Sequence, residues 1–203
     1  MGHLPAGPAA SAIVPELVLA SASPRRRDLL ARIGVAPARI VAPGIDETPL
    51  RHERPHDYVR RIAAGKAAAV ARAPGEVVLA ADTIIAVGRR ILGKPGDAAE
   101  QRAMLALLSG RRHHCLSAVA VIDADGRLRE RLCDTMVSFM PLSPAGIDSY
   151  VASGEGMGKA GGYAIQGRAE AWVRRIDGSW SGVVGLPLFE TRAMLATAGI
   201  ALG

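Results

Sequence analysis

The sequence predicts an α/β protein with a mixed, twisted sheet flanked by helices. Short apolar runs of strand length alternate with longer segments whose apolar residues recur at helical spacing. Turn residues separate neighbouring runs near Gly88 and at Asp125-Gly126, which is typical of hairpins. The hairpin region is expected to form a second lobe, and a cleft between two lobes is a common place for a ligand.

The individual elements follow from length, periodicity and end residues. Ser23 is a suitable N-cap and Pro24 a suitable first residue for an early helix. Residues 154–167 are glycine-rich and predict a loop. Strands are expected over residues 17–20, 39–41, 77–81, 116–123, 128–139, 171–176 and 180–184, and helices over residues 25–33, 55–72, 98–108, 144–152 and 188–197.

The composition indicates one globular domain over residues 16–203. The 203 residues are 49% hydrophobic and 22% charged. Residues 1–15 are rich in small residues and proline, so a disordered extension is expected there, and they lack the pattern of a signal peptide. No apolar run reaches the roughly 18 residues of a membrane helix. Cys115 and Cys133 lack CxxC spacing and are expected to be free thiols, so we expect a cytoplasmic protein without a membrane partner.

The formal net charge of +6 favours an anionic partner. Aromatic residues make up only 3% of the chain, and the lysines and arginines form no long run. Single-stranded nucleic acids are usually bound by stacking on aromatic rings. The pattern therefore favours a small anion in a pocket over a nucleic acid.

Residues 19–27 place two hydroxyls and three guanidinium groups where a strand meets a helix N-terminus. Free backbone N–H groups and the helix dipole favour an anion there, and arginine adds bidentate contacts to phosphate. Arg25, Arg26 and Arg27 oppose the dipole of the first turn, which suggests a functional reason for them. The alternative is an ordinary N-cap with solvated arginines.

Two acidic segments are candidates for catalysis or for binding a divalent metal. Asp82-Thr83 follows an apolar strand, and ligands of open α/β sheets lie beyond the carboxyl ends of strands. Asp46-Glu47 follows another strand, and Mg²⁺ is usually held by one or two carboxylates plus substrate phosphates. The alternatives are a turn cap for Asp82 and a solvated acidic loop for Glu47.

Two phosphate-binding motifs are rejected. Residues 88–94 match GxxxxGK, but Pro95 occupies the position of the metal-binding Ser or Thr and lacks an N–H. Residues 156–161 match GxGxxG but follow a helical segment instead of a strand. Lys159 and Gln166 in that loop could close over a ligand, although a mobile surface loop is the alternative. The histidines, including His113 and His114, lack metal-ligand spacing and are expected to be structural or solvated.

Taken together, these segments resemble the Maf family of nucleotide pyrophosphatases from about residue 17 to residue 195. Each segment alone is weak evidence, and their order makes the resemblance strong. They are residues 19–26 (LASASPRR), 46–47 with 58–59 and 66–67, 81–83 (ADT), 93–95 (GKP), 108–110 (LSG), 158–167 (GKAGGYAIQG) and 183–187 (VVGLP).

The resemblance implies a hydrolase that converts a nucleoside triphosphate into the monophosphate and pyrophosphate. Asp82 corresponds to the proton acceptor that activates water. The resemblance also implies Mg²⁺ or Mn²⁺, with Glu47 and Asp82 as ligands. The triphosphate is expected to bind Arg25, Lys66 and Lys94, with Ser21 lining the same pocket.

The resemblance further implies a preference for dTTP and UTP, with modified pyrimidine triphosphates as further candidates. Arg26, Thr83 and Gln166 match that branch of the family, and an amide can pair with a pyrimidine edge. Three positions depart from the usual family residues, namely Ala22, Ser117 and Gly182, and they leave the catalytic set intact.

A regulatory protein that binds nucleic acid or a partner without turnover is the competing hypothesis. The family has been linked to arrest of cell division, but only the basic charge balance supports this role in the sequence. The sequence does not determine the oligomeric state, and a homodimer is one alternative.

Overall fold

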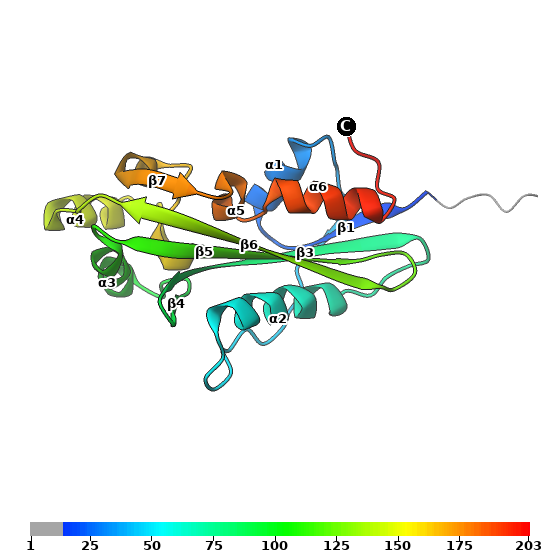
Figure 1. Ribbon diagram of the computed structural model, residues 1–203, viewed down its shortest axis with the longest axis horizontal. Helices are drawn as coiled ribbons and strands as arrows, with labels where there is room; N and C mark the ends of the chain where they lie inside the picture. Colours follow the sequence, from blue (N-terminus) through cyan, green and yellow to red (C-terminus); the bar gives the residue numbers. More distant parts are fainter. Residues whose placement is uncertain (1–13) are drawn as a thin grey trace, which may run out of the picture.

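The protein is described by a computed structural model over residues 14–203. The extension expected at residues 1–15 lies outside the described residues except for its last two positions. The described chain forms an elongated molecule built along one long sheet (Figure 1). Within residues 14–203, no helix has the length and the apolar character that a bilayer crossing requires.

The sheet is mixed, as the sequence predicts. It has seven strands in the order β2-β1-β3-β5-β6-β7, and β4 pairs with β3. The β1 strand is parallel to β2 and β3, and the other pairings are antiparallel. The strands are β1 (Glu16–Ala20), β2 (Arg39–Val41), β3 (Glu76–Val87), β4 (Arg90–Leu92), β5 (Arg112–Ile122), β6 (Leu128–Phe139) and β7 (Val173–Asp177).

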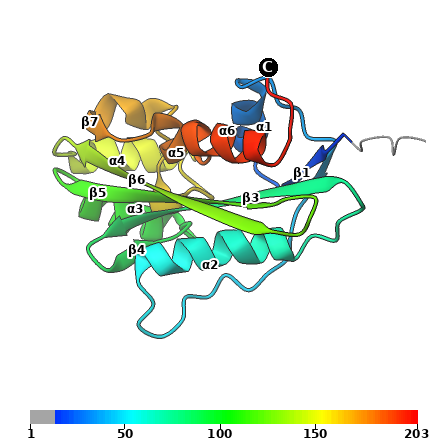
Figure 2. The ribbon, with the colours of Figure 1, turned by 45° about the vertical axis from the view of Figure 1, so that its right-hand side comes forward.

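Helices cover both faces of this sheet. Figure 2 shows α2 beneath the sheet, with α1 and α6 on the opposite face. The helices are α1 (Pro24–Ala31), α2 (Pro55–Ala68), α3 (Ala98–Leu108), α4 (Pro144–Ala152), α5 (Trp180–Val184) and α6 (Leu188–Thr197), with two 3₁₀ turns, η1 (Ala160–Gly162) and η2 (Arg168–Trp172).

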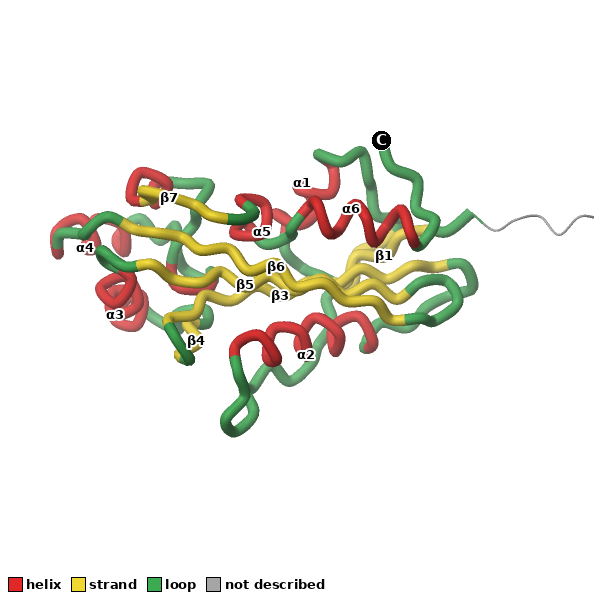
Figure 3. The backbone as a smooth tube through the Cα atoms, viewed as in Figure 1, coloured by secondary structure: helices red, strands yellow, loops and turns green. Residues whose placement is uncertain are grey.

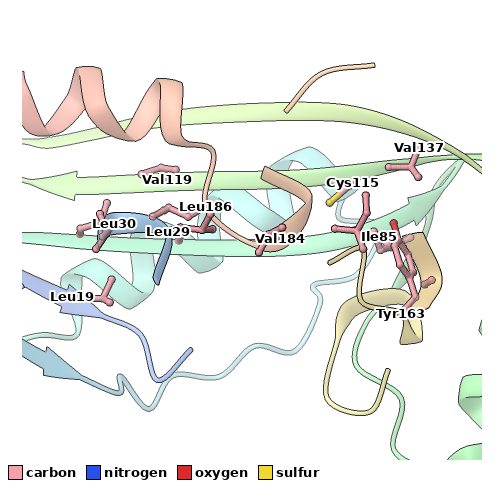
Figure 4. Close-up of a cluster of buried hydrophobic side chains, with 14 of the residues drawn as sticks. Leu19, Leu29, Leu30, Ile85, Cys115, Val119, Val137, Tyr163, Val184 and Leu186 are labelled. Carbon is pink, nitrogen blue, oxygen red and sulfur yellow. The ribbon is translucent and has the colours of Figure 1, made fainter. Parts of the chain in front are cut away.

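Two hydrophobic clusters explain why β1 and β3 are apolar at almost every position. Side chains alternate between the faces of a strand, so a strand that is covered on both sides needs apolar residues throughout. Val18 and Val78 pack in the cluster between the sheet and α2, whereas Leu19 and Leu79 belong to the larger cluster on the other face. Figure 4 shows part of the larger cluster, including Leu19, Leu29 and Tyr163.

The two predicted lobes share the long strands β3, β5 and β6, which run side by side through the molecule (Figure 3). One lobe contains β1, β2, α1 and α6, and the other contains β4, α3, α4 and β7 (Figure 1). The pairing of β3 with β1 stops at Ala80, and its pairing with β4 starts at Ile85. Residues 81–84 of β3 therefore pair only with β5, and the sheet edge is open between the lobes.

Two predictions about this region are wrong in detail. Asp82 does not end its strand, because β3 continues to Val87 while its antiparallel partner β5 runs beside it. The predicted strand at residues 180–184 is the helix α5, since the Ser179 side chain accepts a hydrogen bond from the Gly182 backbone N–H and caps a helical turn. Five residues are too few for helical periodicity to be visible in the sequence.

Smaller differences concern element ends. The first helix stops at Ala31 and the second at Ala68, earlier than expected. The edge strand β7 starts at Val173, because the 3₁₀ turn η2 occupies the preceding residues. The glycine-rich loop at residues 154–167 is confirmed, with the short turn η1 inside it.

Candidate active site

A cleft of about 660 Å³ opens where the sheet edge is free between the two lobes. The β1–α1 junction, the middle of β3, the glycine-rich loop and the end of α5 contribute to its wall. All nine residues to which the resemblance gives a role line it: Ser21, Arg25, Arg26, Glu47, Lys66, Asp82, Thr83, Lys94 and Gln166. Arg27 and Asp46 do not line it. Sequence positions that are up to 145 residues apart, from Ser21 to Gln166, thus meet in one cavity.

Asp82 and Lys66 form a buried ion pair on the floor of the cleft. The Lys66 Nζ atom lies 2.8 Å from Asp82 Oδ1, and the two residues are 8% and 7% exposed. Lys66 comes from α2, whose buried face packs on β3 beneath Asp82. The same Nζ atom lies 3.0 Å from Glu47 Oε1, so one ammonium group contacts two carboxylates. The Tyr58 hydroxyl donates a hydrogen bond to the Glu47 backbone oxygen and holds the Glu47 loop against α2.

The β1–α1 junction places two guanidinium groups at one wall. Ser23 is the N-cap of α1 and Pro24 its first residue, as predicted, although the Ser23 side chain makes no capping bond. Burial lowers the pKa of Arg25, and burial also lowers the pKa of Arg26 despite the nearby Asp82 carboxylate. Desolvated cations of this kind interact strongly with an entering anion.

Lys94 and Lys159 also line the cleft. Lys159 belongs to the glycine-rich loop, and burial, together with the positive charge of Arg25, lowers its pKa. The Gly161 N–H donates to the Gly93 backbone oxygen at 3.0 Å and joins this loop to the segment of Lys94. A Cβ atom on Gly161 would lie 2.7 Å from Ile85 Cγ1, so the close approach requires glycine.

The charge balance of the cleft suits a polyanion. Five cationic side chains line it, against the two carboxylates of Glu47 and Asp82. The cationic residues are Arg25, Arg26, Lys66, Lys94 and Lys159. Such an arrangement binds and orients phosphate groups and stabilises charge that develops on them.

The remaining wall combines Arg26 and Thr83 with the end of α5. Arg26 donates from Nε to the Gly185 backbone oxygen at 2.9 Å and from Nη1 to Ser21 Oγ at 2.9 Å. Thr83 Oγ1 lies 3.5 Å from the same Gly185 oxygen. Gln166 is exposed and lines the same cavity. Arg26, Thr83 and Gln166, for which the resemblance implies base recognition, thus line one cavity with the other cationic side chains.

The acidic residues fit a magnesium or manganese ion held jointly with a substrate. No group of three or more His, Cys, Asp or Glu residues converges within residues 14–203. Glu47 and Asp82 approach one cationic group, the Lys66 ammonium, from two sides. Two carboxylates completed by phosphate oxygens and water are a typical Mg²⁺ environment. The donor set therefore fits a hard divalent cation that binds with the nucleotide.

Apart from Lys94, the rejected phosphate-binding segment at residues 88–94, the two histidines and the two cysteines lie outside the site. Gly88 turns the β3–β4 hairpin, so the GxxxxGK segment does not connect a strand to a helix. His113 is buried and its Nε2 atom lies 2.9 Å from the Tyr163 hydroxyl, and His114 pairs with Asp134. Cys115 and Cys133 are free thiols, as expected.

In the sequence, Ser117 and Gly182 stand out only as departures from the usual family residues, and neither has a predicted role in the site. A strand is predicted over residues 180–184, but Val183, Val184 and Gly185 line the cleft at the end of α5, and Ser117 lies under the cleft without lining it. Only the position of Ser117 opposite Thr83 in a neighbouring strand connects it to the site, and strand register is not visible in the sequence.

The chain is similar to several known proteins. The family model described as "Maf-like protein" matches residues 16–198. A dTTP/UTP pyrophosphatase of Sphingopyxis alaskensis is 70% identical over 94% of this chain and 100% of its own length. A dTTP/UTP pyrophosphatase of Novosphingobium aromaticivorans is 59% identical over 92% of this chain and 93% of its own length. The solved structure of a HAM1 protein from Coxiella burnetii is 19% identical with a TM-score of 0.47, covering 90% of this chain and 99% of that protein.

Proposed function

The chain belongs to the Maf-like protein family, and from that premise we propose that it hydrolyses dTTP and UTP to the monophosphate and pyrophosphate. The main support is the buried Asp82 carboxylate, which faces a cleft lined by five cationic side chains. The names of the two similar proteins support pyrimidine triphosphates as substrates. Modified pyrimidine triphosphates are further candidates.

Phosphate binding is assigned to the cationic walls. Arg25 and Lys94 line the same cleft from different elements of the chain, so a triphosphate bound there receives positive charge from both. Lys159 is added to the set that the sequence suggested, because it lines the same cleft and lies within electrostatic reach of Arg25. Ser21 contributes a hydroxyl whose orientation is fixed by Arg26 Nη1. Phosphoryl chemistry depends mainly on such positioning and charge stabilisation.

Asp82 is proposed to activate water. A water oxygen attacks the α-phosphorus while Asp82 accepts a proton from that water. The bond between the α-phosphorus and its bridging oxygen to the β-phosphorus breaks, and pyrophosphate leaves with that oxygen. The Lys66 ammonium holds the Asp82 carboxylate in a fixed position at the floor of the cleft, and Arg25 and Lys94 stabilise the charge on the leaving group.

Glu47 and Asp82 are proposed to hold Mg²⁺ or Mn²⁺ together with the nucleotide. The metal would neutralise phosphate charge when bound. Glu47 is exposed and lines the cleft together with Ala42 and Pro43 of the same loop, and the Tyr58 hydroxyl donates to its backbone oxygen. Cytoplasmic location, a homodimer and a link to cell division stay predictions.

A product analysis tests the proposed function. The protein is incubated with dTTP, UTP, the other common triphosphates and modified pyrimidine triphosphates in Mg²⁺ or Mn²⁺, and pyrophosphate and orthophosphate are measured separately. The expected result is pyrophosphate release in equal amounts with the monophosphate, fastest for dTTP and UTP. Release of orthophosphate, or no hydrolysis of any nucleotide, contradicts the proposal.

A further inference from the structure

A buried serine controls the hydroxyl of Thr83 from beneath the cleft. Ser117 on β5 is the direct antiparallel partner of Thr83 on β3. It is 0% exposed and does not line the cavity. Its Oγ atom lies 2.8 Å from Thr83 Oγ1 and 2.6 Å from the backbone oxygen of Gly182.

These two distances fix the direction of both hydrogen bonds. A carbonyl oxygen only accepts, so the single proton of the Ser117 hydroxyl is donated to Gly182. The Thr83–Ser117 contact then requires the proton of Thr83, and Ser117 Oγ accepts it. The Gly185 backbone oxygen also lies near Thr83 Oγ1, but at the longer distance of 3.5 Å. It is therefore a weaker acceptor for the Thr83 proton than Ser117 Oγ.

Thr83 consequently presents only lone pairs to the cleft. Among residues 14–203, no protein donor is recorded at Thr83 Oγ1 apart from the shared contact with Ser117. The Arg26 guanidinium lies beside it, since Arg26 Nε donates to the same Gly185 oxygen at 2.9 Å. Arginine carries donors only. The wall therefore offers a fixed acceptor next to a fixed donor.

We infer that Ser117 is a specificity-determining positioning residue, which makes the Arg26–Thr83 pair complementary to a nucleobase with a carbonyl beside a ring N–H. Uracil and thymine carry this pair of groups. Cytosine carries a ring nitrogen without hydrogen at that position, so its lone pair would oppose those of Thr83. The inference rests on the proposed function, because it requires the base of a nucleotide at this wall.

The test is the ratio of kcat/KM for UTP to kcat/KM for CTP, two substrates with the same triphosphate and ring size. In Ser117→Ala, Thr83 loses its stronger acceptor and keeps only the long contact with the Gly185 oxygen, so its proton becomes available to cytosine. We expect the ratio to fall by about tenfold or more, the effect of one base-specific hydrogen bond. Ser117→Thr keeps the hydroxyl and is expected to retain the ratio of the unaltered protein.

A second pair of variants separates a local effect on Thr83 from general damage to the fold. Thr83→Val removes the hydroxyl and should lower the same ratio, whereas Thr83→Ser should retain it. If Ser117 acts through Thr83, then adding Ser117→Ala to Thr83→Val changes the ratio no further, as a double-mutant cycle shows. This pair also stands on its own if Ser117→Ala does not fold.

The outcomes distinguish the inference from the proposed function. A ratio in Ser117→Ala or Thr83→Val that stays within about twofold of the unaltered protein, with UTP still hydrolysed, overturns the inference and leaves the proposed function intact. Further loss of the ratio on adding Ser117→Ala to Thr83→Val overturns the action through Thr83. No hydrolysis of UTP by the unaltered protein overturns the proposed function itself.

Discussion

The Lys66 Nζ atom lies 2.8 Å from a carboxylate oxygen of Asp82 and 3.0 Å from one of Glu47. Among residues 14–203, by contrast, Asp82 forms a salt bridge with Lys66 alone. The ion pair is therefore asymmetric. Loss of Asp82 leaves the ammonium with Glu47, whereas loss of Lys66 leaves a buried carboxylate without a salt-bridge partner, with the charge of Arg26 nearby. Removing one partner of a buried pair is costly because the other charge stays desolvated.

The asymmetry predicts different stabilities for two variants. Lys66→Met should lower the free energy of unfolding by about 3 kcal/mol, and Asp82→Asn by only about 1 kcal/mol. Urea denaturation without nucleotide or metal measures both. Equal losses in the two variants would contradict the asymmetry, and the double variant should recover part of the loss of Lys66→Met.

The glycine-rich loop predicts a matched pair of alanine variants. Gly158 and Gly161 have nearly the same φ, 70° and 69°, but only Gly161 lacks space, with Ile85 Cγ1 at 2.7 Å from an added Cβ. Gly158→Ala should cost about 1 kcal/mol for its left-handed conformation, and Gly161→Ala should cost a further 1–3 kcal/mol, roughly, for the clash.

Thermal unfolding compares these two variants, and KM for dTTP reports the position of the loop. KM should rise in Gly161→Ala more than in Gly158→Ala, because the displaced loop carries Lys159 and Gln166. A Gly161→Ala protein as stable as Gly158→Ala would show that Ile85 yields to the added methyl group.

The acidic loop predicts a specific dependence on metal. Chelation of divalent cations should abolish turnover and readdition of Mg²⁺ should restore it. Glu47→Gln should raise the Mg²⁺ concentration needed for half-maximal rate by about tenfold or more, since one carboxylate ligand is lost. Asp46→Asn is the matched control, because Asp46 is adjacent but does not line the cleft. Equal Mg²⁺ requirements in the two variants would exclude Glu47 as a ligand.

The buried His113 predicts a pH dependence of stability. Burial lowers the pKa of His113 from 6.5 to about 4, so the folded protein favours the neutral ring, whose Nε2 atom shares a hydrogen bond with the Tyr163 hydroxyl. Its contribution is complete above pH 6.5 and is lost as the pH falls towards 4. The total loss is at most about 3 kcal/mol.

Denaturation from pH 7 to pH 4 measures this dependence. His113→Gln should flatten the curve over that interval, and His56→Gln, an exposed control, should not. Ion pairing with Arg61 and Arg39 lowers the pKa of Glu53 and Glu76 to about 2, so their effect appears at lower pH, below about 4.5. An unchanged slope in His113→Gln would contradict the burial effect.

The sequence predicts the fold class and the members of the cleft well, for identifiable reasons. The apolar runs of β1 and β3 are buried on both faces, and such runs are legible without tertiary contacts. Arg25 and Arg26 follow Pro24 in a segment whose chemistry suits phosphate, and both line the cleft with Asp82 and Lys94.

Tertiary pairing explains what the sequence does not reveal. The β3 strand passes through Asp82 because β5 pairs with it, and that register also places Ser117 beneath Thr83. The α5 helix forms because Ser179 caps it, although Trp180–Val184 has the composition of a strand. The Lys66 contact with two carboxylates depends on how α2 packs on β3, which periodicity alone does not specify.

The turnover of Asp82→Asn tests the central claim most directly. Pyrophosphate release from dTTP is measured at saturating Mg²⁺ for the unaltered protein, for Asp82→Asn and for Asp125→Asn, an exposed aspartate in the β5–β6 turn. The account predicts a loss in kcat of about 100-fold or more in Asp82→Asn and no change in Asp125→Asn. A folded Asp82→Asn protein with the kcat of the unaltered enzyme would contradict it.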